Sequence, residues 1–153
     1  MTSLLHHYEF DTNRHIGTGD TPLSRVLAIE AKTDNPVTLE RIEVFCDDQA
    51  GDATNAHLVC CISDGTLTDG NRLSNGILRQ VGREDVKRSG SKLVFSIGEE
   101  CQTILLISMN SSNSDFRGGV QTEVTNIHWV DVYGNQEDQD KLKEVTRKIE
   151  LSL

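Results

Sequence analysis

The stretch RVLAIEAKTDNPVTLERIEVFCD, residues Arg25–Asp47, gives the clearest indication of the fold. Two runs rich in Val, Ile and Leu flank the cluster Thr33–Pro36. Asp and Asn side chains in such a cluster bond to their own backbone, and Pro presets φ for a turn. Both runs roughly alternate apolar and polar residues, which is typical of half-buried strands. We therefore expect two consecutive antiparallel strands joined by a turn.

The apolar residues of the second run fall into two sets of opposite parity, namely Val37 and Leu39 in one and Ile42, Val44 and Cys46 in the other. A strand of strict period two cannot bury both sets, whereas one extra residue switches the faces. We predict a β-bulge near Glu40 and Arg41. In the first run the odd positions from Leu27 to Ala31 are apolar, so we expect Glu30 to face outward.

Two further segments are more apolar than a half-buried strand. Ala56–Ser63 is apolar at both parities, which predicts a central strand covered on both sides. Gln102–Asn110 contains Ile104–Ile107, the most apolar block in the chain, and we expect it to be the central strand of a sheet. Thr122–Tyr133 is a further predicted strand and carries the only tryptophan.

The C-terminal segment is open to two interpretations. Asn135 is a suitable N-cap for a helix with acidic residues in its early turns, and Leu142, Val145 and Ile149 have helical spacing. The last apolar residues also share parity, which favours a closing strand. We predict a short helix from Glu137 to about Glu144, followed by a strand from Val145 to Leu153.

The pattern as a whole favours an all-β fold in one domain spanning residues 1–153. About eight or nine short strands are separated by turns rich in Gly, Asn and Asp, without βαβ alternation. This predicts an antiparallel β-sandwich of jelly-roll or Greek-key type, with a closed barrel as the alternative. Residues 1–21 are expected to form an edge strand or an N-terminal arm that docks on a neighbouring subunit.

The charge balance bears on partners. The formal net charge is −9, with 15 basic against 24 acidic residues. Phosphate backbones attract concentrated Lys and Arg, so nucleic acid and anionic membranes are poor partners. We see no secretion signal and no apolar run long enough to span a bilayer. The four cysteines lack the spacing of a disulfide framework, which favours buried reduced thiols and a cytoplasmic or virion location.

The acidic loops give a metal hypothesis. Calcium prefers carboxylate and carbonyl oxygens, and the chain offers five candidate ligands, Asp47, Asp48, Asp52, Asp64 and Asp69. They form one site only if their loops meet at one end of the sandwich. The EF-hand spacing is absent, and turn chemistry alone explains Asp residues in loops.

No catalytic signature is visible, so a non-enzymatic protein is favoured over an enzyme. Asp131 interrupts the apolar parity of its predicted strand and lies near His128 in the sequence. This pair is the only feature of the sequence that suggests a reaction centre. For carbohydrate recognition the available aromatic residues are Tyr8, Phe116, Trp129 and Tyr133.

A loop-rich acidic sandwich without a reaction centre favours a non-enzymatic structural, assembly or interaction protein, with other protein subunits as partners and self-association into a homo-oligomer. A viral or phage particle component, such as a decoration or minor structural subunit, is one instance, by analogy of fold. The alternatives are a ligand-binding module for carbohydrate or calcium, and an enzyme on a jelly-roll or barrel scaffold.

Overall fold

The computed structural model describes residues 2–17, 23–32, 35–48, 56–67, 73–74, 78–110 and 124–150, with side chains at 2–10, 27–32, 35–47, 57–65, 78–108 and 125–142. These residues form the strands β1 (Thr2–Gly17), β2 (Leu23–Ala31), β3 (Val37–Asp48), β4 (Ala56–Ser63), β5 (Thr66–Leu67), β6 (Leu73–Ser74), β7 (Arg79–Asp85), β8 (Ser91–Cys101), β9 (Thr103–Asn110), β10 (Val124–Asn135) and β11 (Leu142–Glu150), and one 3-10 helix, η1 (Gln136–Asp138).

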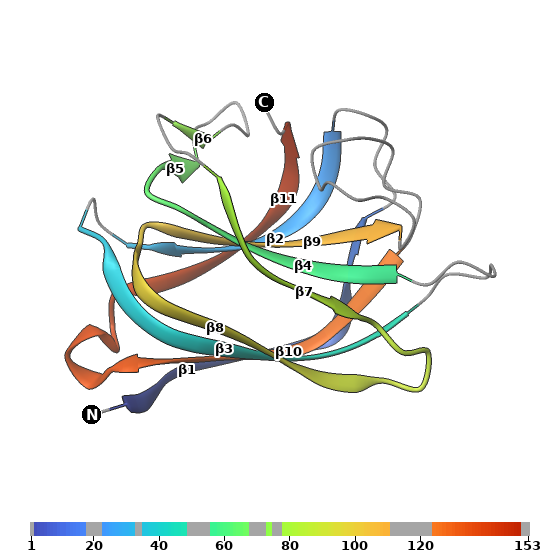
Figure 1. The fold of residues 1–153 in the computed structure, drawn as a ribbon, viewed down its shortest axis with the longest axis horizontal. Coiled ribbons are helices and arrows are strands. Elements are labelled where there is room, and N and C mark those ends of the chain that lie inside the picture. The colour runs from blue at the N-terminus through green and yellow to red at the C-terminus, as the bar shows by residue number, and fades with distance from the viewer. Residues whose placement is uncertain are drawn as a thin grey trace.

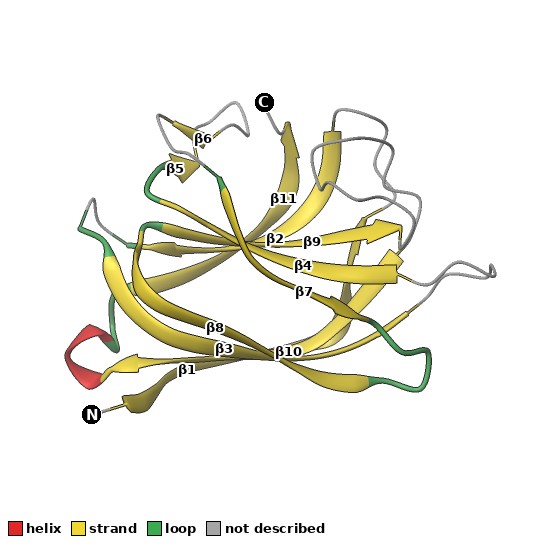
Figure 2. Ribbon diagram, viewed as in Figure 1, coloured by secondary structure: helices red, strands yellow, loops and turns green. Residues whose placement is uncertain are grey.

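The strands build an antiparallel β-sandwich (Figure 1). The first sheet has the order β1-β10-β3-β8, and the second has the order β2-β9-β4-β7, with β11 paired along the other side of β2. Among the described residues, a single pairing, Gly17 with Arg25, links the two sheets. Almost all of the described chain is strand, and η1 is the only helix in that part of it (Figure 2).

Most successive long strands lie in different sheets. The chain passes from β1 in the first sheet to β2 in the second, back to β3 and across to β4. β7 then lies beside β4 in the second sheet, and the crossing resumes with β8, β9 and β10. Eight strands wound in this way form a jelly roll, one of the two sandwich types that the sequence predicts. β5 and β6 form a separate two-stranded ribbon.

The core lies between the sheets and is built from the inward parity of each strand. Ile42 and Val44 of β3, Phe95 of β8, and Leu58 and Leu106 of the second sheet are all buried in it. The predicted bulge is confirmed, because the register of β3 with β8 shifts between Leu39 and Arg41. Both apolar sets of β3 are therefore buried, as the change of parity required.

The two apolar segments, Ala56–Ser63 and Gln102–Asn110, form inner strands of the second sheet, as predicted. β9 lies between β4 and β2, and both β4 and β9 are buried at both parities. Glu30 faces away from the core, as predicted, because Leu27 and Ile29 of the opposite parity pack in it, but its side chain is only 5 % exposed. β2 is an inner strand between β11 and β9, and the outward side of the sheet is also buried at Ala28, Val59 and Leu105.

The predicted order of a short helix followed by a strand at the C-terminus was correct, but the predicted boundaries were wrong. Asn135 does cap a helix, since its side-chain oxygen accepts a hydrogen bond from the Glu137 N–H. That helix is the three-residue η1, and β11 already begins at Leu142. Pairing of Leu142 to Glu150 along the whole of β2 outweighs the helical spacing, because tertiary pairing overrides weak local preference.

Candidate functional site on the outer face of the first sheet

The first sheet turns one surface away from the core, and we call this surface the outer face. Residues directly opposite each other in neighbouring strands point to the same side of a sheet. Backbone pairing thus places three rows on the outer face, namely Glu9–Trp129–Phe45–Lys92, His7–Asp131–Glu43–Val94 and Leu4–Tyr133–Arg41–Ser96.

Aromatic rings gather in the middle of the outer face. Trp129 and Phe45 are half-buried and stack with their ring centroids 6.0 Å apart and their planes 19° apart. His7 lies on the other side of Trp129, with its ring centroid 5.9 Å away. In the third row the Arg41 guanidinium lies 3.8 Å from the centroid of the Tyr133 ring, a cation–π contact.

Two histidine–carboxylate pairs lie beside these rings. His7 Nδ1 bonds to Asp131 Oδ1 across β1 and β10, and its Nε2 lies 3.8 Å from Glu9 Oε2. His128 Nε2 lies 2.5 Å from Asp47 Oδ2 across β10 and β3. The register shift between Ile127 and Trp129 gives β10 an extra residue at this point, so that His128 also meets the Phe45 ring edge-on.

A third carboxylate of the outer face, Glu43, is shared by two cations. Arg41 Nε donates to Glu43 Oε2 at 2.9 Å, and Lys92 Nζ lies 3.3 Å from Glu43 Oε1. The hydrogen bond from Arg41, followed by the Lys92 ammonium, lowers the pKa of Glu43 against the opposing effect of burial. The half-buried carboxylates Glu43, Asp131 and Asp47 are therefore each held by a basic group on the same face.

The outer face also exposes apolar side chains. Among the described side chains, Leu4 and Val94 are the large hydrophobic residues that stand exposed, at 46 % each. They project from the edge strands β1 and β8, on the same side as the aromatic rings. An exposed apolar group rimmed by polar residues is typical of an interaction site.

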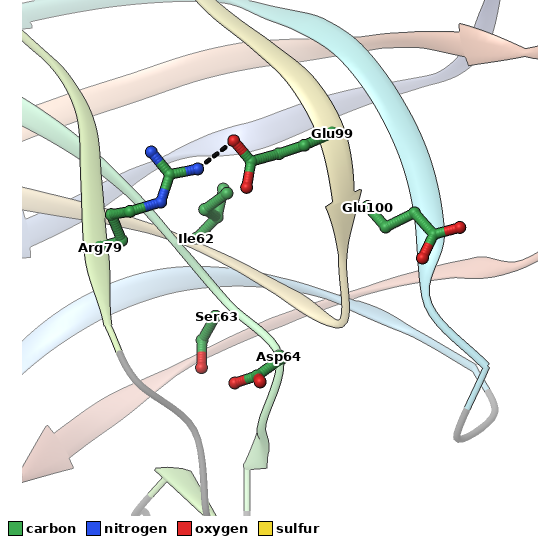
Figure 3. A pocket seen from close by; sticks show the side chains of 6 residues that line it. All are labelled: Ile62, Ser63, Asp64, Arg79, Glu99 and Glu100. Atoms are coloured by element: carbon green, nitrogen blue, oxygen red, sulfur yellow. Dashed lines mark ion pairs between the residues drawn. The ribbon is translucent and has the colours of Figure 1, made fainter.

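A small hollow lies at one end of the sandwich, where β4 ends and β7 begins. It has a volume of about 210 Å³ and is lined by Ile62, Ser63, Asp64, Arg79, Glu99 and Glu100. Figure 3 shows Arg79 of β7 and Glu99 of β8 pointing toward each other and forming an ion pair beside this hollow. This ion pair connects β7, the edge strand of the second sheet, with β8, the edge strand of the first sheet.

A shallow groove of about 230 Å³ lies next to the third row of the outer face. Its lining includes the hydroxyls of Thr2 and Thr38, the Glu40 carboxylate and the Asn135 amide. The bulge of β3 and the absence of a side chain at Gly98, which leaves open space there, help to form this groove. It thus offers polar side chains next to Gly134, the residue that follows Tyr133 in β10.

The five predicted calcium ligands do not all come together. Asp47 lies near the start of β8, opposite Asn126, whereas Asp64 follows β4 near the start of β9. These two places are at opposite ends of the sandwich. Asp52 and Asp69 lie outside the described residues, and only the backbone of Asp48 is described.

The described part of the chain contains no group of three or more His, Cys, Asp or Glu side chains arranged to hold a metal. Calcium binding at either end stays a prediction. A rise in melting temperature with Ca²⁺ that a chelator reverses is the result expected from such binding, since a ligand selective for the folded state stabilises it.

The structure does not bring His128 and Asp131 together as a reaction centre. His128 bonds to Asp47 and Asp131 bonds to His7, so the two residues serve different partners. Neither lines the hollow or the groove described above. Both pairs lie on the outer face of the first sheet, with side chains that are partly exposed to solvent.

The sequence missed two members of the outer face, Phe45 and His7. Phe45 shares the parity of Glu43 and Asp47, and an aromatic residue among polar positions of a strand was the available signal. His7 meets Asp131 only through the pairing of β1 with β10, which no local pattern reveals. Of the aromatic residues named from the sequence, Tyr8 is buried in the core and Phe116 lies outside the described residues.

Comparison with known proteins adds no relative to this description. Within the residues that the structure describes, no helix has the length and apolar character needed to cross a bilayer. No family model, curated protein or solved structure matches the chain.

Proposed function

We propose that the chain is a non-enzymatic structural or assembly protein that acts by associating with other protein subunits, first of all with copies of itself. One observation carries the proposal. Trp129, Tyr133, Phe45 and Arg41 lie on one open sheet surface together with exposed apolar residues. Trp, Tyr and Arg are the residues most enriched at the energetic centres of protein interfaces.

The architecture supports the same proposal. Jelly rolls serve as capsid subunits, lectins and cupins, so the fold alone does not choose among these roles. The cavities found among the described residues are small and open, which favours recognition by a surface over reaction in a pocket. A decoration or minor structural subunit of a viral or phage particle, located in the virion or the cytoplasm, is the instance we favour.

Nucleic acid is not among the partners that we propose. Each cation of the outer face lies beside a carboxylate, as Arg41 and Lys92 do beside Glu43. A phosphate backbone needs basic side chains that are free of such partners.

The solution mass tests the proposed function. Sedimentation velocity of the full chain from low micromolar to millimolar concentration should show species heavier than the 17.0 kDa chain, increasing with concentration. A single 17.0 kDa species over the whole range would contradict self-association.

A carbohydrate-binding role is the second candidate, and the groove beside Gly134 is the observation that favours it. Thr2, Thr38, Glu40 and Asn135 line this groove, and side chains of these types can bond sugar hydroxyls. Calorimetric titration of the natural chain with a panel of oligosaccharides should give saturable binding that Glu40→Ala weakens. Absence of binding would argue against the role.

A further inference from the structure

We propose that two copies of this chain meet through the outer face, so that this face, and not a loop tip or the opposite sheet, is the surface of self-association. The inference rests on the proposed function, because it names the contact surface and the partner for the association proposed there. Three observations support it, namely the charge of the face, its size and its edge residues.

The charge of the chain bears on which partner can associate with the outer face. Each copy carries a formal net charge of −9, so two copies repel each other over most of their surface. On the outer face the half-buried Glu43 carboxylate lies between two cations, Arg41 and Lys92. A second acidic copy therefore meets less repulsion around Glu43 than at a surface with carboxylates alone, whereas a basic partner is attracted more strongly to such an acidic surface.

The size of the face agrees with what a stable dimer needs. β10 has 12 residues, so at a rise of ~3.3 Å per residue it is about 40 Å long. Four strands spaced ~4.8 Å apart are roughly 19 Å wide, which gives an area of about 750 Å². A standard interface buries about 800 Å² on each partner.

The edge strands add apolar contact where a flat sheet would otherwise end in polar residues. Leu4 on β1 and Val94 on β8 stand at the two sides of the face, with Trp129 and Phe45 between them. A partner that covers the rings covers these two side chains as well. Apolar area removed from water in this way supplies association energy of about 25 cal/mol per Å² before the costs of ordering.

The test places a charge on each side of the face. Val94→Glu and Leu4→Glu each add one negative charge at an exposed position, so both variants should fold with a nearly unchanged melting temperature. Gln80→Glu makes the same charge change at an exposed position of β7 in the second sheet and serves as the control. Sedimentation velocity of the full chain then gives the dissociation constant of each protein.

We expect each outer-face variant to raise the dissociation constant at least about tenfold, which corresponds to roughly 1.4 kcal/mol, and the control to stay within about twofold. Trp129 emission should shift to shorter wavelength as the natural chain associates, because the ring loses contact with water. Association that is insensitive to both variants and leaves Trp129 emission unchanged would overturn this inference while sparing the proposed function. A natural chain that stays monomeric would overturn both.

Discussion

Glu43 shows how one carboxylate can hold several groups of the outer face in place. It lies between Arg41, which also covers the Tyr133 ring, and Lys92 of the edge strand. With a side chain only 13 % exposed, the carboxylate is screened from water more than an ordinary surface acid. Arg41 thus contacts the Glu43 carboxylate and the Tyr133 ring at the same time.

Replacing this carboxylate should be measurable. Glu43→Gln removes two charge-assisted contacts, and we expect the free energy of unfolding to fall by about 1–2 kcal/mol at pH 7. Glu84→Gln, at an exposed position of β7, should change it by less than about 0.5 kcal/mol. Urea unfolding of the three proteins makes the comparison, and equal losses in both variants would show that Glu43 has no special role.

The same pair of proteins should differ in their response to acid. The pKa of Glu43 is lower in the folded protein than in the unfolded chain, so its stabilisation is fully present above the unfolded value of about 4.3. The stabilisation is lost as the pH falls through the lowered folded pKa. The difference in unfolding free energy between the natural chain and Glu43→Gln should therefore shrink steadily below pH 4, and a constant difference down to pH 2 would contradict this assignment.

The cysteines give a second prediction at this scale. All four are free and buried, and burial raises the pKa of Cys46 and of Cys101 to about 12 and that of Cys60 well above its usual value. Because the thiolate is the reactive form, a thiol reagent at pH 8 should react with none of the four in the folded protein and with all four in denaturant. Rapid reaction of any one thiol without denaturant would show that its site opens readily.

At the scale of the elements, β7 and β8 close one side of the sandwich by a close contact. A side chain at Gly82 of β7 would place its Cβ 2.6 Å from Cδ1 of Phe95 in β8. Phe95 is almost fully buried in the core, so its ring has little room to move. The absence of a side chain at Gly82 lets the two edge strands approach each other.

This contact predicts a coupling between two substitutions. Gly82→Ala should lower the free energy of unfolding by about 1–3 kcal/mol, because overpacking forces the ring from its position. In a Phe95→Leu background the same substitution should cost less than half as much, since the smaller side chain leaves room. A double-mutant cycle measured by chemical denaturation tests this, and strictly additive effects would show that Gly82 and Phe95 do not interact.

Two elements, β3 and η1, show what could and could not be predicted from the sequence. The bulge of β3 was predictable because Val37 and Ile42 must both be buried and strand geometry allows only one solution. The helix after Asn135 was overestimated because the spacing of Leu142 and Val145 suits either element, and only pairing with β2 decides between them. Contacts such as His7 with Asp131 join residues far apart in the chain, so no local pattern could predict them.

At the scale of the whole molecule, the salt dependence of association separates two kinds of interface. Raising the ionic strength shortens the Debye length from about 30 Å at 0.01 M to about 8 Å at 0.15 M. Repulsion between two acidic copies is then screened, whereas burial of Trp129 and Val94 is not weakened. We expect the dissociation constant to fall severalfold over this range, and a rise would show that ion pairs between copies dominate the contact.

The pairing of the first strand with β10 has a consequence for how the chain reaches this structure. β1 spans residues 2–17, yet its partner β10 begins only at Val124. During synthesis the first strand must therefore wait, unpaired along most of its length, until more than four-fifths of these 153 residues have been made. Synthesis adds roughly 5–20 residues per second, so a nascent chain of this protein has an interval of several seconds in which a chaperone can bind the unpaired strand.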